Sequence, residues 1–175
     1  MTVALKPLSL AGVPRALEKA ERYRLLNEPA EAESICRDVL SVDPQNQLAL
    51  VTLVLSLADA FDVRASDGVR AVDAVLAQIA DPYQRVYYRG VLRERWARAL
   101  VKTGDPGAQA LGWIHDAMRS YEEAQDLVRQ DGNDDASLRF NACVRLIERA
   151  GLSHAPYDED HLDAIDTGDT VPTRR

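Results

Sequence analysis

Hydrophobic residues recur at three- and four-residue steps along most of the chain, and polar residues fill the positions between them. This period is that of an α-helix with one buried face. Two such helices are predicted at residues 14–26 and 29–41, separated by Asn27-Glu28-Pro29. Proline suits the first turn of the second helix, because its missing N–H would have no intrahelical partner there. The segment is therefore predicted to form a helical hairpin.

Five further helices are predicted after this hairpin. Residues 46–61 are apolar almost all round, which indicates a helix buried on more than one side. Periodic segments continue over residues 67–79, 83–102, 108–130 and 133–150, and Gly151 is a suitable C-cap for the last one. Seven helices in this order predict three hairpins followed by one unpaired helix.

Particular residues of the first hairpin resemble the tetratricopeptide repeat (TPR), a helix–turn–helix unit that stacks into a solenoid. Their order and spacing carry the resemblance: Ala20, Tyr23, Ala32, Cys36, Val39 and Pro44. Small residues let the two helices approach closely, and the aromatic ring fills the gap to the next unit. Ala16 and Lys19 depart from the family pattern, which usually has an aromatic residue and a leucine there.

The resemblance implies an all-α, right-handed α-solenoid of about three TPR-like hairpins plus a C-terminal capping helix, covering residues 14–152. Residues 1–13 lack helical period and are expected to form an extended arm. Residues 153–175 carry six acids between Asp158 and Asp169 and are expected to form a flexible tail.

The composition of the 175 residues, 46% hydrophobic and 28% charged, is that of an ordinary globular domain. The formal net charge of −7 argues against general affinity for nucleic acid or anionic membranes. No apolar run reaches the roughly 18 residues that a membrane span needs. Pro7 and Pro14 interrupt the N-terminal segment, which has no signal-peptide core, so we expect a cytoplasmic protein.

No catalytic, metal or cofactor site is predicted. Cys36 and Cys143 lie in helical apolar stripes, which favours buried free thiols over a disulfide or a metal pair. His115 has no nucleophile nearby in sequence, and no glycine-rich phosphate loop exists. One further set has the right residue types for a metal but no compact zinc spacing: His154, Asp158, Asp160 and His161.

Residues 83–102 concentrate positive charge in an acidic chain. Six cations oppose the single acid Glu94: Arg85, Arg89, Arg93, Arg95, Arg98 and Lys102. At about 100° per residue they form two stripes, with Tyr88 and Trp96 on an apolar strip between them. The arginines could pair with acids on neighbouring helices. Alternatively, with Lys102, Tyr88 and Trp96, they could bind an acidic peptide, because arginine forks suit carboxylates.

We therefore predict a non-enzymatic adaptor or chaperone that binds a peptide or partner protein on the concave face of the solenoid. The alternatives are a self-assembling structural subunit and a nucleic-acid-associated regulator that uses residues 83–102. The carboxylate clamp of chaperone-binding TPR domains is absent, because other residues fill its positions: Leu17, Glu21, Arg24, Leu48, Val51 and Leu55. The small size and acidity resemble the type III secretion translocator chaperones. The acidic tail could dock on the arginine helix or remain solvated.

Overall fold

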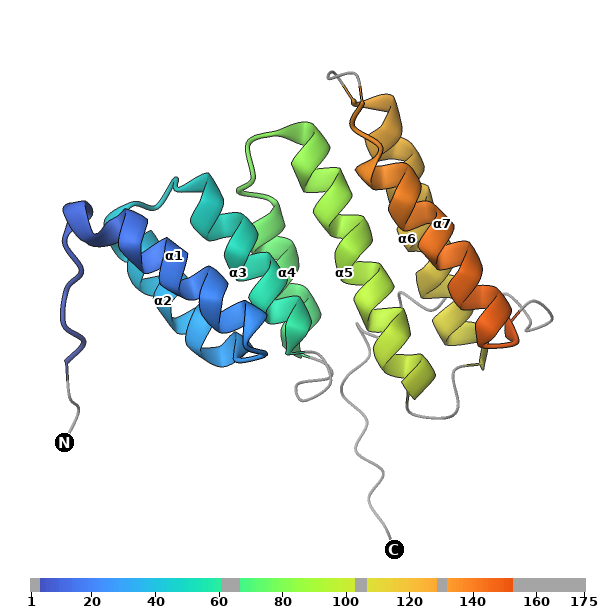
Figure 1. Ribbon diagram of the computed structural model, residues 1–175, viewed down its shortest axis with the longest axis horizontal. Helices are drawn as coiled ribbons and strands as arrows, with labels where there is room; N and C mark the ends of the chain where they lie inside the picture. Colours follow the sequence, from blue (N-terminus) through green and yellow to red (C-terminus); the bar gives the residue numbers. More distant parts are fainter. Residues whose placement is uncertain (1–3, 61–66, 103–106, 129–131, 153–175) are drawn as a thin grey trace, which may run out of the picture.

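The computed structural model describes residues 4–60, 67–102, 107–128 and 132–152, and these residues form helices without any strand (Figure 1). A short 3-10 turn, η1 (Leu10–Gly12), precedes seven α-helices. These are α1 (Val13–Leu25), α2 (Pro29–Val42), α3 (Gln47–Asp59), α4 (Asp67–Leu76), α5 (Pro82–Lys102), α6 (Gly107–Asp126) and α7 (Asp135–Arg149). The prediction of an all-α chain is confirmed.

Local chemistry explains where several helices begin and end. Proline occupies the first turns of α1 and α2, as expected from its fixed backbone angle. The Asn46 side chain accepts a hydrogen bond from the Ala49 N–H at 2.9 Å and caps α3. Asn27 and Gly151 adopt the left-handed region, with φ of 61° and 66°, where the chain turns after α1 and α7.

The contacts between helices indicate that the helices form two layers. Each helix packs against the next, and α1 also packs against α3, α3 against α5, and α5 against α7. No comparably extensive contact joins α2 to α4 or α4 to α6 within the described residues. The odd-numbered helices therefore form one continuous layer, and the even-numbered helices cover it from one side. In Figure 1 the helices succeed one another from α1 to α7 across the molecule.

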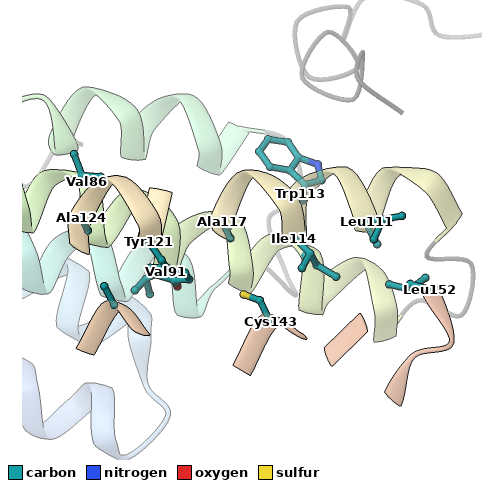
Figure 2. Packing of buried hydrophobic residues seen from close by; sticks show 13 residues of the cluster. Val86, Val91, Leu111, Trp113, Ile114, Ala117, Tyr121, Ala124, Cys143 and Leu152 are labelled. Carbon is teal, nitrogen blue, oxygen red and sulfur yellow. The ribbon is translucent and has the colours of Figure 1, made fainter. Parts of the chain in front are cut away.

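The core has two large clusters, and α5 contributes to both; a smaller third cluster joins α1, α2 and α3. One large cluster joins α1–α5 and includes the fully buried Leu50 and Val54 of α3. The other joins α5–α7 around Ile114, Tyr121 and Cys143 (Figure 2). Tyr88 packs against both clusters. Because α3 has neighbours on several sides, its almost uniformly apolar sequence is explained.

The residues that carry the resemblance to a tetratricopeptide repeat do not all pack alike. Ala20, Ala32, Cys36 and Val39 are fully buried, whereas Tyr23 is half-buried and Pro44 is exposed. The predicted N-terminal arm is shorter than expected, because η1 forms within it and α1 already begins at Val13. The predicted tail, residues 153–175, and the histidines and acids proposed there lie outside the described residues.

Candidate partner-binding surface

The α5 arginines separate onto the two layers of the molecule. Arg85, Arg89 and Arg93 make their contacts on the side of the even-numbered helices. Arg89 pairs with Glu123 of α6 at 2.6 Å, and Arg93 donates to Ser120 Oγ at 3.0 Å. Arg85 donates to the Ile79 carbonyl oxygen at 3.2 Å. Each arginine of this stripe thus has an intramolecular partner, although Arg89 Nε is buried without a hydrogen bond.

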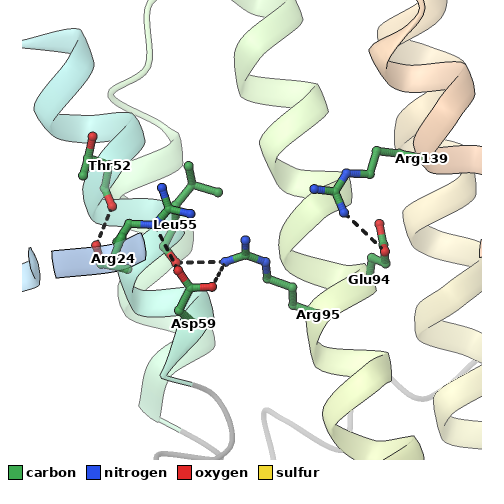
Figure 3. A network of polar contacts seen from close by, with 8 residues as sticks. Arg24, Thr52, Leu55, Asp59, Glu94, Arg95 and Arg139 are labelled. Atoms are coloured by element: carbon green, nitrogen blue, oxygen red, sulfur yellow. Dashed lines mark hydrogen bonds and ion pairs between the residues drawn. The ribbon is translucent and has the colours of Figure 1, made fainter. Parts of the chain in front are cut away.

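Arg95 instead faces the odd-numbered helices. Its guanidinium pairs with one carboxylate oxygen of Asp59 on α3 and donates to the Leu55 carbonyl oxygen at 3.0 Å. The other Asp59 oxygen accepts a hydrogen bond from Arg24 Nε of α1 at 3.0 Å. Figure 3 shows Arg24, Asp59 and Arg95 in one line across α1, α3 and α5. A single carboxylate therefore links three odd-numbered helices.

Glu94 of α5 binds a second group of side chains, which come from α5, α6 and α7. Its side chain is fully buried, and Oε2 accepts a hydrogen bond from the Tyr121 hydroxyl of α6 at 2.7 Å. Oε1 accepts from Arg98 Nε at 2.9 Å and lies 3.5 Å from Arg139 Nη1 of α7. A buried carboxylate is tolerated only when it is paired and hydrogen-bonded. Glu94 meets this condition with groups from α5, α6 and α7.

Burial and charge shift the pKa values of these groups in directions that follow from the contacts. Burial lowers the pKa of Arg95, and the charge of Asp59 opposes this change. Burial also acts to lower the pKa of Arg139, but Glu94 and a hydrogen bond to Tyr87 outweigh it and raise the pKa. The pKa of Tyr121 is raised by burial and by the negative charge of Glu94. The pKa values of Arg139 and Tyr121 thus move further from neutrality, so Arg139 stays charged and Tyr121 stays neutral at pH 7.

Four arginines dominate the charge of this region, and we call them the arginine row: Arg24, Arg95, Arg98 and Arg139. They face two carboxylates, Asp59 and the fully buried Glu94, which leaves an excess of two positive charges on a chain with net charge −7. The row is accessible, because the Arg98 and Arg139 side chains are 41% and 39% exposed. We call this face of α1, α3, α5 and α7 the odd-helix surface.

Tyrosines lie beside the arginine row. Tyr87 forms a hydrogen bond with Arg139, stacks on Tyr83 with ring centroids 5.7 Å apart, and meets Tyr88 edge-on at 5.2 Å. Tyr88 lies within electrostatic reach of Arg24. The odd-helix surface thus combines guanidinium groups with aromatic rings that can contact apolar side chains.

The predicted binding residues of segment 83–102 lie partly on the odd-helix surface, partly on the side of the even-numbered helices and partly in the core. The structure places Arg95 and Arg98 in the arginine row, and Lys102 is exposed at the last residue of α5. Trp96 packs edge-on against Trp113 at 6.3 Å and adjoins both core clusters, so it belongs mainly to the core. Arg24 joins the site from α1, at one of the positions that the carboxylate clamp occupies in chaperone-binding TPR domains. Arg139 joins it from α7 and was not predicted from the sequence.

The described residues were also compared with the requirements of a metal site and a membrane span. No group of three or more His, Cys, Asp or Glu side chains there could hold a metal ion. A hollow of about 230 Å³ between α6 and α7 is lined by Tyr121, Glu122, Gln125, Ala136, Ser137, Phe140 and Asn141. The Ser137 hydroxyl there donates a hydrogen bond to Gln125 Oε1 at 2.8 Å. None of the helices in the described ranges is both long and apolar enough to cross a membrane.

No protein-family model matches the chain, and no curated protein or solved structure matches it either.

Proposed function

We propose that this protein is a non-enzymatic, cytoplasmic adaptor or chaperone that binds an acidic segment of a partner protein on the odd-helix surface. The observation that carries the proposal is the arginine row, an accessible excess of positive charge on an otherwise acidic protein. Arginine forks bind carboxylates in a bidentate manner, and the adjacent tyrosines offer apolar contact area to such a segment.

The proposal includes a right-handed stack of three tetratricopeptide-like hairpins, α1–α2, α3–α4 and α5–α6, with α7 as the cap. The order of contacts supports it, because the odd-numbered helices form a continuous layer and each hairpin packs only on its neighbours. In such a stack the first helices of the hairpins line the concave face. The arginine row would then lie on the face that receives the partner.

An acidic protein segment suits this surface better than nucleic acid does. Nucleic-acid binding relies on neutralising many phosphates along a basic track, and it is opposed here by a net charge of −7. The Asp59 carboxylate lies between Arg24 and Arg95 and interrupts the positive track. A segment that carries acids and apolar residues together matches the alternation of guanidinium groups and tyrosine rings.

The test is a titration of the full chain with a short peptide of glutamate and leucine, followed by calorimetry. Arg95→Gln is expected to weaken binding about tenfold, which is the typical value of a charge-assisted hydrogen bond. Arg24 still pairs with Asp59 in this variant, so no carboxylate is left alone. Binding should also weaken as salt concentration rises.

The matched control is Arg89→Gln, which removes a guanidinium from the same helix on the side of the even-numbered helices. Arg89 pairs with the exposed Glu123 carboxylate, and an exposed pair of this kind contributes about 0–1 kcal/mol to stability. Unchanged peptide affinity in this variant and a loss in Arg95→Gln would support the proposal. Equal losses in both variants, or no binding by the wild type, would refute it.

A further inference from the structure

Arg98 and Arg139 converge on one oxygen of a buried acid. Arg98 donates from Nε and Nη2 to Glu94 Oε1 at 2.9 and 2.8 Å, and Arg139 Nη1 approaches the same oxygen at 3.5 Å. The Tyr121 hydroxyl donates to the opposite oxygen at 2.7 Å. Glu94 is fully buried, so it holds the two guanidinium groups from the protein side and occupies none of their outer surface.

Donors remain on the outer side of this arginine pair. Each guanidinium carries five N–H groups. Arg98 directs two of them to Glu94, and Arg139 directs others to Glu94 and Tyr87. Both side chains are about two-fifths exposed, at 41% and 39%. Two planar donor groups from α5 and α7 are thus held side by side, with further N–H groups accessible to a ligand.

The charge balance selects the class of ligand. Glu94 compensates one of the two positive charges of the pair. Arg95 lies within electrostatic reach of Arg139 and Glu94, and it shares the Asp59 carboxylate with Arg24. The arginine row as a whole keeps an excess of two positive charges. A single carboxylate would neutralise half of this excess. A phosphate monoester carries about −1.5 to −2 charges and three acceptor oxygens, so it matches both the charge and the donors.

We propose that Arg98 and Arg139, positioned by the buried Glu94, form a binding site for a phosphate monoester. The proposal deepens the proposed function, because a phosphorylated side chain in the acidic partner segment would supply this group. A small phosphorylated molecule would present the same chemistry. Tyr87, which is hydrogen-bonded to Arg139, adds an aromatic edge to the site.

The experiment compares phenyl phosphate with benzoate, which have the same ring but different charge and numbers of acceptors. Calorimetry on the full chain at pH 7.5 is expected to show phenyl phosphate binding at least about tenfold more tightly. Its binding should weaken as pH falls through about 6, where the monoester takes up its second proton. Benzoate affinity should stay level over that interval. Equal affinities for the two ligands would overturn the proposal.

Substitutions of the two arginines test whether phenyl phosphate binds at this pair. Arg98→Lys keeps the charge but removes the planar fork, and it is expected to weaken phenyl phosphate binding about tenfold; Arg139→Gln should do the same. Thermal unfolding of each variant separates loss of binding from loss of folding. Because the Arg98 side chain is 41% exposed, Arg98→Lys is the more conservative change. Full retention of binding by folded Arg98→Lys together with loss in Arg89→Gln would place the ligand elsewhere and refute the proposal.

A pair of peptides distinguishes the two sources of the phosphate group. They share one sequence of acidic and apolar residues and carry either phosphoserine or serine. Tighter binding of the phosphorylated form supports a phosphorylated partner, and preference for free phenyl phosphate alone supports a small-molecule ligand. Acidic-peptide binding without any phosphate preference would refute this inference and leave the proposed function standing.

Discussion

At the scale of single residues, Gly90 shows how tightly α5 and α6 approach each other. A Cβ atom added at Gly90 would lie 2.7 Å from Cε1 and 2.9 Å from Cδ1 of Tyr121. The tyrosine ring is 1% exposed, and its hydroxyl is bonded to Glu94 at 2.7 Å. The ring therefore has little freedom to move away, and the small residue is required by packing.

Gly90→Ala should consequently destabilise the protein, although alanine favours helix over glycine by about 1 kcal/mol. Overpacking of a close-packed core typically costs about 1–3 kcal/mol, so we expect a net loss of up to about 2 kcal/mol. Urea unfolding measures it. The control is Ser34→Ala on the exposed side of α2, which should not destabilise. A gain of stability in Gly90→Ala would show that α5 and α6 lie further apart.

The burial of Glu94 could not be predicted from the sequence. Glu94 is a lone acid among arginines, and its sequence context resembles an ordinary solvated position. Its burial depends on Arg98 from the same helix, Tyr121 from α6 and Arg139 from α7. The i,i+4 spacing to Arg98 was readable, but the two partners from other helices were not.

At the scale of helices, the order and approximate ends of the elements could be predicted because each depends on local chemistry. Period, prolines and caps identified seven helices, and the observed ends of most lie within a few residues of the predicted ones. The apolar stripe of an amphipathic helix predicts its buried face, but the neighbours that its polar face meets depend on tertiary packing. This is why the two arginine stripes of α5 were recognised, whereas their assignment to opposite layers required the structure.

The labelling rates of Cys36 and Cys143 measure how readily α2 and α7, respectively, open. Burial raises the pKa of both thiols to about 12, from 9.0, so very little reactive thiolate exists at pH 8 while the helices stay closed. Within the described residues α7 packs extensively on α6 and only slightly on α5, whereas α2 packs extensively on both α1 and α3, so α7 should open more readily. We expect slow labelling by a thiol reagent at pH 8, with Cys143 faster than Cys36.

Peptide mass mapping after timed labelling distinguishes the two thiols. Denatured protein provides the control, since both thiols should then react rapidly with similar rates. Immediate labelling of both cysteines in the folded protein would contradict the core packing of α2 and α7.

At the scale of the whole molecule, the fold groups positive charges on one surface. The chain is acidic overall. Helices that lie far apart in the sequence nevertheless bring four arginines together on the odd-helix surface. Composition alone indicated an acidic protein without general affinity for anions. The three-dimensional arrangement shows a local group of arginines, and this arginine row is the basis of the proposed function.

The most direct test of this central claim is an NMR titration that follows the arginine Nε–Hε signals during addition of the glutamate–leucine peptide. We predict that the signals of the arginine row, Arg24, Arg95, Arg98 and Arg139, shift in a saturable manner, while those of Arg37 and Arg89 stay in place. Arg37 is paired with Glu33 on the surface of α2, and Arg89 with Glu123 on the side of the even-numbered helices. Shifts confined to Arg89 and Arg93, or spread evenly over all arginines, would contradict partner binding on the odd-helix surface.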